Sequence, residues 1–226
     1  MAAARASITH VIYDMDGLLL DTEPFYTQVT REIVGRYGHT FDWGLKSKMI
    51  GKRAIDSARI LVDALNLPIP PEEYLREREA MLEELFPTAK PMPGAMRLTE
   101  HLVRHGIPQA VASSSDRRQF DLKISRHRAW FESFRCIVLG DDPEVRRGKP
   151  SPDIFLTAAA RMGADNQNCL VLEDAPSGVE AAQAAGMSVV AVPNPGMNPA
   201  SFGNGLTILS SLESFDPADW GLPGFD

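Results

Sequence analysis

The sequence predicts an α/β fold, in which a doubly wound, Rossmann-like parallel sheet forms the core and a small all-helical cap domain is inserted. Three observations lead to this prediction. Apolar, strand-like runs alternate with helical patterns along most of the chain, which is typical of parallel sheets. The runs are continuously apolar, as expected of strands that are buried on both faces. Between Thr22 and Pro91 the alternation stops, and only helical patterns are found.

The core elements follow one another in a regular order. The runs that predict strands are THVIYD, PQAVASS, CIVLGD, CLVLED, SVVAVP and LTILSS, at residues 9–14, 108–114, 136–141, 169–174, 188–193 and 206–211. The helices predicted between the later runs are Gly94–Arg104, Asp116–Phe131, Asp153–Met162 and Ser177–Ala185. This order predicts helices on both faces of one sheet.

The helical insertion predicts a separate domain. We expect residues 1–20 and 91–226 to form the core, and residues 21–90 to form the cap. In the stretch PPEEYLREREAMLEELF, two glutamates follow the prolines and leucines recur at helical spacing. The proline-rich stretch PTAKPMPG is a plausible hinge back into the core. The alternative is that these helices pack directly on the main sheet.

Thr22 predicts the start of the first cap helix. It is a natural N-cap residue, and Asp21 and Glu23 are favourable beside the positive end of a helix. We therefore assign these two acids to the cap and not to chemistry.

Composition excludes several classes of function. The net charge of −7 and the lack of a basic block argue against binding of nucleic acid. No apolar run approaches the length of a membrane span, and the first ten residues lack the apolar stretch of a secretory signal. Cys136 and Cys169 lie far apart without a CxxC motif, so they are expected to be small core residues. We expect a cytoplasmic monomer that binds no membrane.

The predicted strands end in polar residues that can carry chemistry. Ligands of doubly wound folds bind at the carboxyl ends of the strands, so these residues are expected to lie together. They are Asp14 and Asp16 after the first run, Ser113, Ser114 and Ser115 after the second, Lys149 beyond the third, and Glu173 and Asp174 after the fourth.

This set predicts a site for Mg²⁺ and phosphate. Clustered carboxylates need a cation to remain ionised together, and carboxylate oxygens suit Mg²⁺, which commonly shares its coordination with phosphate. We assign phosphate binding to Ser113, Ser114 and Lys149, because hydroxyl and ammonium groups can hold phosphate oxygens. Two alternatives stay open: Ser113 could cap the helix that starts near Asp116, and Lys149 could be a solvated loop lysine.

The four segments, in this order and with this insertion, resemble the haloacid dehalogenase superfamily of phosphohydrolases. Its first motif is matched by Asp14-Met15-Asp16-Gly17, its second by Ser113, its third by Lys149 and its fourth by Glu173-Asp174. Two aspartates one residue apart are a weak signal, whereas four ordered motifs on strand ends are specific. The resemblance covers essentially the whole chain and implies a phosphoric monoester hydrolase.

The resemblance implies a role for each acid of the first and fourth motifs. Asp14 would be the nucleophile that forms an aspartyl-phosphate. Asp16 would protonate the leaving alcohol and later deprotonate the attacking water. Gly17 would let the chain turn toward the cap. Glu173 would lie behind the metal ligands and orient either a metal-bound water or Lys149.

The same resemblance implies the ligands of the metal and of the phosphate. Mg²⁺ would be held by Asp14, the backbone carbonyl of Asp16 and Asp174. Ser113 and Lys149 would hold the phosphoryl oxygens as charge redistributes.

Residues within the predicted cap bear on the substrate. The stretch Met49–Arg53 resembles the loop that such caps lower over the leaving group, and Gly51, Lys52 and Arg53 are candidates for substrate specificity. The alternative for Lys52 and Arg53 is a solvated helix start.

Several stretches, among them DMDGLLLDTE, GKPSPDIF and LVLEDAPSGVEAA, look most like pseudouridine-5′-phosphatase and its relatives. Expected substrates are therefore small-molecule phosphate esters: pseudouridine 5′-phosphate, or a sugar or glycerol phosphate. One alternative is a β-phosphoglucomutase-type phosphotransferase, although that branch carries a histidine where this chain has Tyr26. Another is a protein of this fold that binds phosphorylated ligands without turnover.

Overall fold

The structure is a computed structural model that describes residues 7–49 and 54–225. The chain divides into two compact units, Met1–Asp21 with Lys90–Asp226 and Thr22–Ala89. We call the first the core unit and the second the helical unit. The boundaries of the two units expected from the sequence, after residues 20 and 90, each differ from the observed ones by one residue.

The core unit contains a parallel sheet, as predicted. Within the described residues the sheet has six strands in the order β3-β2-β1-β4-β5-β6, and each pair of neighbours is parallel. The strands are β1 (His10–Tyr13), β2 (Gln109–Ser113), β3 (Cys136–Leu139), β4 (Cys169–Glu173), β5 (Ser188–Ala191) and β6 (Thr207–Ile208). This order places the reversal of a doubly wound sheet at β1, and ligand sites of such sheets lie at the reversal.

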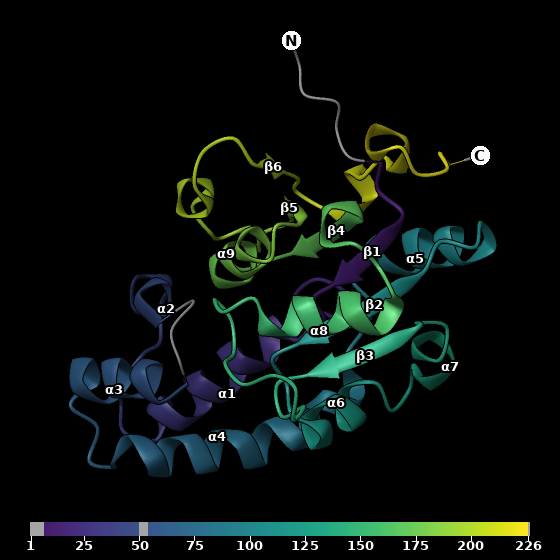
Figure 1. The fold of residues 1–226 in the computed structure, drawn as a ribbon. Coiled ribbons are helices and arrows are strands. Elements are labelled where there is room, and N and C mark those ends of the chain that lie inside the picture. The colour runs from purple at the N-terminus through teal and green to yellow at the C-terminus, as the bar shows by residue number, and fades with distance from the viewer. Residues whose placement is uncertain (1–6, 50–53, 226) are drawn as a thin grey trace. The chain divides into compact units, whose positions relative to one another are not determined.

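Helices cover both faces of this sheet (Figure 1). The helices of the core unit are α5 (Ala95–Arg104), α6 (Arg117–Lys123), α7 (Arg128–Phe131), α8 (Asp153–Met162) and α9 (Pro176–Ala184). Short 3-10 helices also occur there: η2 (Asn166–Asn168), η3 (Pro199–Phe202), η4 (Leu212–Ser214) and η5 (Pro217–Trp220). The doubly wound α/β prediction is therefore confirmed for the core.

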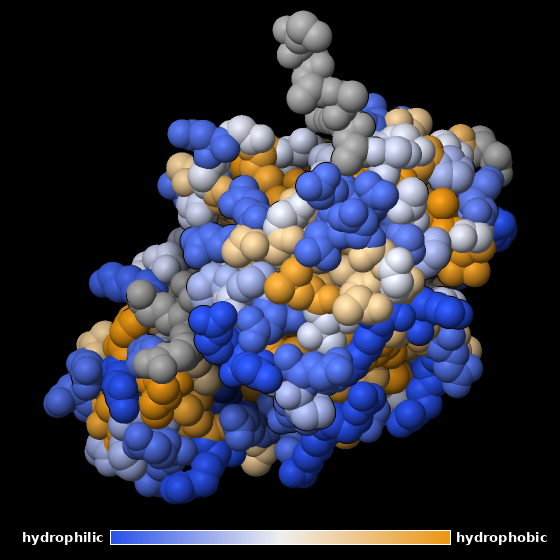
Figure 2. Space-filling view, viewed as in Figure 1, coloured by the Kyte–Doolittle hydropathy of each residue, from blue (hydrophilic) through white to orange (hydrophobic). Residues whose placement is uncertain are grey.

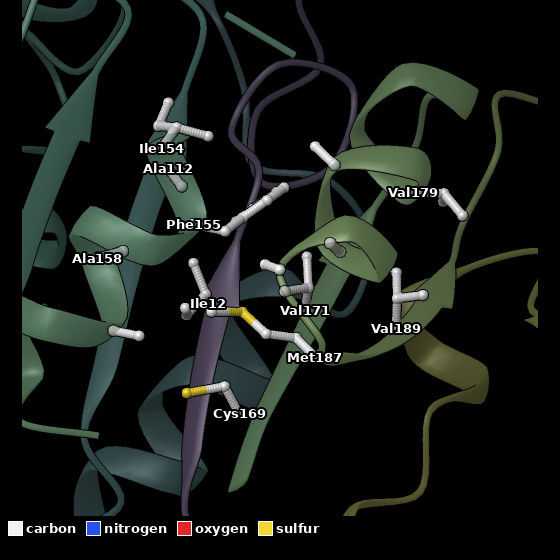
Figure 3. Packing of buried hydrophobic residues seen from close by; sticks show 14 of the residues in the cluster. Ile12, Ala112, Ile154, Phe155, Ala158, Cys169, Val171, Val179, Met187 and Val189 are labelled. Carbon is white, nitrogen blue, oxygen red and sulfur yellow. The ribbon is translucent and has the colours of Figure 1, made fainter. Parts of the chain in front are cut away.

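The face covered by α8 and α9 holds a large apolar cluster (Figure 3). The cluster contains the side chains of Ile12 from β1 and Val171 from β4. The buried side chains of Phe155 and Met187 belong to the same cluster. Cys169 is a buried core residue of this cluster, as predicted, and its thiol is free. Burial, and to a lesser degree Asp165, raises the pKa of that thiol to about 11.

The predicted helix at 116–131 is divided in the structure. α6 ends at Lys123 and α7 begins at Arg128, with turn hydrogen bonds between the two, such as His127 N to Ile124 O. Beyond the break, Trp130 donates from Nε1 to Thr99 Oγ1 of α5, 2.8 Å away. Sequence periodicity alone did not reveal the break, because tertiary contacts select it.

The described part of the helical unit consists of helices and their connections, without a strand. Its helices are α1 (Glu23–Gly35), α2 (Trp43–Met49), α3 (Ala54–Leu65), α4 (Pro71–Leu85) and the 3-10 helix η1 (Phe86–Thr88). Thr22 occupies the N-cap position of α1, as predicted, although its side chain makes no capping hydrogen bond. Glu23 in the first turn pairs with Lys46 of α2 at 3.2 Å. No pattern in the sequence predicted α2.

The two segments that leave and re-enter the core unit run side by side. Leu20 forms a bridge with Pro91, and the backbone N–H groups of Asp21 and Met92 donate to Lys90 and Leu19. These backbone bonds join the ends of the core unit where the helical unit is inserted.

Polar residues cover most of the face seen in Figure 2, and hydrophobic residues form smaller groups. Among the helices of the described residues, none combines the length and the apolar character that a membrane crossing requires.

Candidate active site

The sheet brings the predicted polar residues to one edge. Asp14 directly follows β1, Ser113 ends β2 and Glu173 ends β4, and both β2 and β4 pair with β1. The backbone N–H of Asp14 donates to Leu172 O at 3.0 Å, so the pairing continues one residue beyond β1. The polar groups therefore lie at the reversal of the sheet.

Lys149 joins these strand ends. Its Nζ lies 2.6 Å from Asp14 Oδ1 and 2.6 Å from Glu173 Oε1, and it donates to Ala112 O at 3.1 Å. An ammonium group has three N–H donors, and these contacts can use all of them. The Lys149 side chain is 5% exposed, so the alternative of a solvated loop lysine is wrong.

Glu173 is held from two sides. Its Oε1 pairs with Lys149, and its Oε2 accepts a hydrogen bond of 2.9 Å from the backbone N–H of Ala175. Gly178 of α9 packs against the carboxylate so closely that a Cβ there would overlap it. Of the two roles expected for Glu173, the observed contact is the one with Lys149.

Substituting Gly178 with alanine is expected to displace Glu173 and, through it, Lys149. Alanine favours helix by about 1 kcal/mol over glycine, but the overlap should reverse the sign and destabilise the protein by about 1–3 kcal/mol. Urea unfolding and activity assays would measure both effects. Gly35→Ala in α1 is the matched control, because the added Cβ meets no atom within 4 Å beyond its own residue, its chain neighbours and the nearby helix backbone. Equal or higher stability and unchanged activity in Gly178→Ala would contradict the expected displacement.

Charge and burial act together on Asp14 and Lys149. Burial raises the pKa of Asp14 to about 7 against the attraction of Lys149, and the neighbouring Glu173 and Asp16 add to the increase. Burial alone would lower the pKa of Lys149, but Asp14 and Glu173 outweigh it and the pKa rises. Lys149 is therefore a permanent cation, whereas ionisation of Asp14 is opposed by its surroundings.

Asp16 lies beyond the strand, in a turn made by Gly17. Gly17 has φ of +81°, a left-handed conformation that favours glycine, and its N–H donates to Leu20 O at 2.8 Å. Asp16 Oδ2 accepts hydrogen bonds from Ser115 Oγ at 2.9 Å and from Ser113 Oγ at 3.4 Å. The turn and the two serines thus direct the Asp16 carboxylate toward the end of β2.

The three serines at the end of β2 and just beyond it differ in their surroundings. Asp116, and not Ser113, caps α6, because its Oδ1 accepts the N–H of Gln119 at 2.8 Å. Ser113 and Ser115 are buried against Asp16, as described above. Ser114 is exposed, and its side chain makes no hydrogen bond to a described residue. The structure thus gathers Ser113 and Ser115 around Asp16, and it leaves Ser114 at the rim.

Lys123 is a residue of the site that sequence reasoning missed. Its Nζ lies 2.7 Å from Asp16 Oδ1 and donates to Ser115 Oγ at 2.7 Å. Its side chain is fully buried. A lysine in the polar stretch RRQFDLK resembles any solvated helical lysine, so no sequence signal distinguished it.

The remaining predicted site residues are Asp174 and the three candidates at positions 51–53. Asp174 is buried directly after β4. Among the described residues there is no group of three or more His, Cys, Asp or Glu side chains arranged to hold a metal ion. The predicted metal ligands are the side chains of Asp14 and Asp174 and the backbone carbonyl of Asp16. They include only two such side chains, so they do not form a group of three. Gly51, Lys52 and Arg53 lie outside the described residues.

The family model described as haloacid dehalogenase-like hydrolase matches residues 8–186. The protein named (DL)-glycerol-3-phosphatase 2 of Arabidopsis thaliana is 50% identical over 100% of this chain and 96% of its own. "Probable pseudouridine-5'-phosphatase" of Drosophila melanogaster is 43% identical over 96% of each chain. A HAD family hydrolase from Deinococcus radiodurans, solved with bound phosphate and sodium, has a TM-score of 0.82 at 24% identity, covering 97% of this chain and 100% of the other.

Proposed function

This chain belongs to the haloacid dehalogenase-like hydrolase family and is a phosphoric monoester hydrolase, and we propose that it hydrolyses small phosphate monoesters with Mg²⁺ through an aspartyl-phosphate on Asp14. The observation that carries this proposal is the pairing of a buried Asp14 with Lys149, beside Asp16, at the reversal of the sheet. This arrangement supplies a nucleophile, a cation for phosphate and a proton carrier in one place.

Asp14 is the proposed nucleophile. Its ion pair with Lys149 uses Oδ1, which orients the carboxylate and leaves the other oxygen for attack on phosphorus. The new bond joins a carboxylate oxygen to phosphorus, and the bond from phosphorus to the leaving oxygen breaks. In the second step water attacks the same phosphorus, and the bond to Asp14 breaks to release inorganic phosphate.

Asp16 is the proposed proton carrier of both steps. It gives its proton to the leaving oxygen in the first step and takes a proton from water in the second, so it returns to its starting state. Its position two residues beyond the nucleophile, in a separate turn, supports this division of roles. Ser113 and Lys149 are proposed to bind the phosphoryl oxygens, with Ser114 at the rim as a further candidate.

The donor set at the strand ends fits Mg²⁺. Asp14, the backbone carbonyl of Asp16 and Asp174 offer hard oxygen ligands, as this ion prefers. Four carboxylates in this region (Asp14, Asp16, Glu173 and Asp174) outnumber the ammonium groups of Lys149 and Lys123, which favours a divalent cation. When bound, Mg²⁺ offsets the negative charges of the nucleophile and the phosphate. It would also favour the ionised form of Asp14, against the burial that raises the pKa of this carboxyl.

The helical unit is the proposed cap that selects substrates, with Gly51, Lys52 and Arg53 as its candidate specificity residues. The names of the two relatives support glycerol 3-phosphate and pseudouridine 5′-phosphate as first candidates, and sugar phosphates remain candidates from the sequence. We place glycerol 3-phosphate first, because the relative with that activity in its name is the more similar one. The proposed setting is a cytoplasmic monomer without nucleic-acid or membrane partners.

The test is release of inorganic phosphate from para-nitrophenyl phosphate and from a panel of glycerol, nucleoside and hexose phosphates. We expect turnover that requires Mg²⁺, stops in excess chelator and returns when Mg²⁺ is added. Full activity in chelator would overturn the metal assignment. Conversion of a sugar 1-phosphate to the 6-phosphate, with little free phosphate, would identify a phosphotransferase. No turnover of any ester would identify a binding protein.

A further inference from the structure

Lys123 is a fully buried cation at the end of α6, outside the four motifs that define the site. Burying an ammonium group costs several kcal/mol unless it is paired and hydrogen-bonded. Replacing a buried ion pair with apolar residues is often neutral or stabilising. Stability is therefore a weak reason for a lysine at this position, and its contacts point to a different one.

The contacts of Lys123 form a closed ring with Asp16. Nζ pairs with Asp16 Oδ1 at 2.7 Å and donates to Ser115 Oγ at 2.7 Å. Ser115 Oγ in turn donates to Asp16 Oδ2 at 2.9 Å. A hydroxyl has one proton, and because Lys123 donates to the oxygen, that proton is free to point at Asp16. Lys123 thus acts on both carboxylate oxygens, directly on one and through Ser115 on the other.

The ring also limits how the carboxylate can rotate. Each oxygen of Asp16 has its own donor: Lys123 of α6 for Oδ1, and Ser115, two residues beyond β2, for Oδ2. α6 is itself anchored by the Asp116 cap and by Phe120, which stacks edge-on against Phe131. Lys123 is therefore a rigid support and not a mobile surface side chain. Catalytic groups lose efficiency when they are displaced by about 1 Å, so such a support matters for proton transfer.

We propose that Lys123 is a positioning residue that holds the Asp16 carboxylate, with Ser115, in the orientation for proton transfer to the leaving oxygen. The inference rests on the proposed role of Asp16. It predicts that loss of Lys123 slows hydrolysis most for esters whose leaving group needs a proton. An alkoxide is a poor leaving group and needs the proton, whereas para-nitrophenolate leaves readily without one.

The experiment compares kcat/KM for two esters in Lys123→Met and in the wild type. The alkyl ester is the member of the panel that the wild type hydrolyses fastest, with glycerol 3-phosphate tried first, and the aryl ester is para-nitrophenyl phosphate. We expect kcat/KM to fall by about 30- to 100-fold for the alkyl ester and by about threefold or less for the aryl ester. The ratio of the two is unaffected by any inactive fraction of the variant.

Two further variants sharpen the result. Ser115→Ala removes the indirect contact alone and is expected to change the ratio in the same direction by a smaller factor. Arg126→Met removes one positive charge from an exposed position three residues further along and is expected to leave the ratio unchanged. Equal losses on both esters in Lys123→Met would show a merely structural role and overturn the inference. An unchanged ratio at full activity would overturn it too.

Asp16→Asn separates this inference from the proposed function. If that variant is selective for the aryl ester and Lys123→Met is not, Lys123 has no positioning role and the function of Asp16 stands. If Asp16→Asn shows no selectivity, the proton-carrier role of Asp16 fails and the inference for Lys123 fails with it.

Discussion

Replacing Asp14 with asparagine is expected to lower kcat by roughly 10⁴- to 10⁶-fold for every phosphate ester that the enzyme hydrolyses. An amide has nearly the shape of the carboxylate but cannot form the proposed acyl phosphate. The first step should therefore be lost both for esters with good leaving groups and for esters with poor ones. Steady-state phosphate release would measure the loss. Trapping of a phosphorylated protein from labelled substrate would assign the loss to the first step, because only the wild type should carry the label.

Asp21→Asn is the matched control for this variant. The chemical change is the same and lies seven residues along the chain, but Asp21 is exposed and its described hydrogen bond is through the backbone N–H to Lys90. We expect wild-type kcat in this control. Retention of more than about one hundredth of the activity in Asp14→Asn would remove Asp14 from the role of nucleophile.

Replacing Lys149 with methionine is expected to cause the largest combined loss of stability and activity. The change leaves Asp14 and Glu173 buried beside each other without the ammonium that both contact at 2.6 Å. Removing one partner of a buried ion pair costs about 3–5 kcal/mol, and we expect a loss of that size in urea unfolding. Activity should fall as well, because Lys149 is the cation proposed to bind the phosphoryl oxygens.

A second substitution separates the two effects. In the double variant with Glu173→Gln, one of the two buried charges is removed, so part of the stability should return while activity stays low. Lys48→Met in the helical unit, at an exposed position, is the control and should leave stability within about 0.5 kcal/mol of the wild type. Recovery of activity together with stability would mean that Lys149 is only structural. Wild-type stability in Lys149→Met would contradict the burial argument itself.

Much of the core and many of the candidate site residues could be read from the sequence, for a definite reason. The strands are buried on both faces, so their continuous apolar runs are visible without an alignment, and each run ends where polar residues begin. Parallel strands all point the same way, so Asp14, Ser113 and Glu173 had to arrive at one edge. The helical pattern after Thr22 similarly marked where a second unit is inserted.

Other features depended on contacts between distant segments. The 116–131 helix is interrupted after Lys123, and beyond the break Trp130 donates to Thr99 of α5, a contact that no local periodicity reports. Adjacent serines are equivalent in the sequence, yet Ser115 is buried on Asp16 whereas Ser114 is exposed. Which hydroxyl faces the site depends on how the chain turns between β2 and α6.

The sequence by itself determined the α/β class of this protein. It also predicted the order of its motifs and the identity of the candidate nucleophile. All three depend on local apolar runs and on the polar residues at their ends. Only the tertiary structure decided which groups touch. Lys149 spans from its loop to two strand ends, Gly178 makes room for Glu173, and Lys123 is buried under Asp16 although its helix is polar. The reason is physical. The free energy that a charged group contributes depends on its burial and its partners, and both are properties of the folded chain.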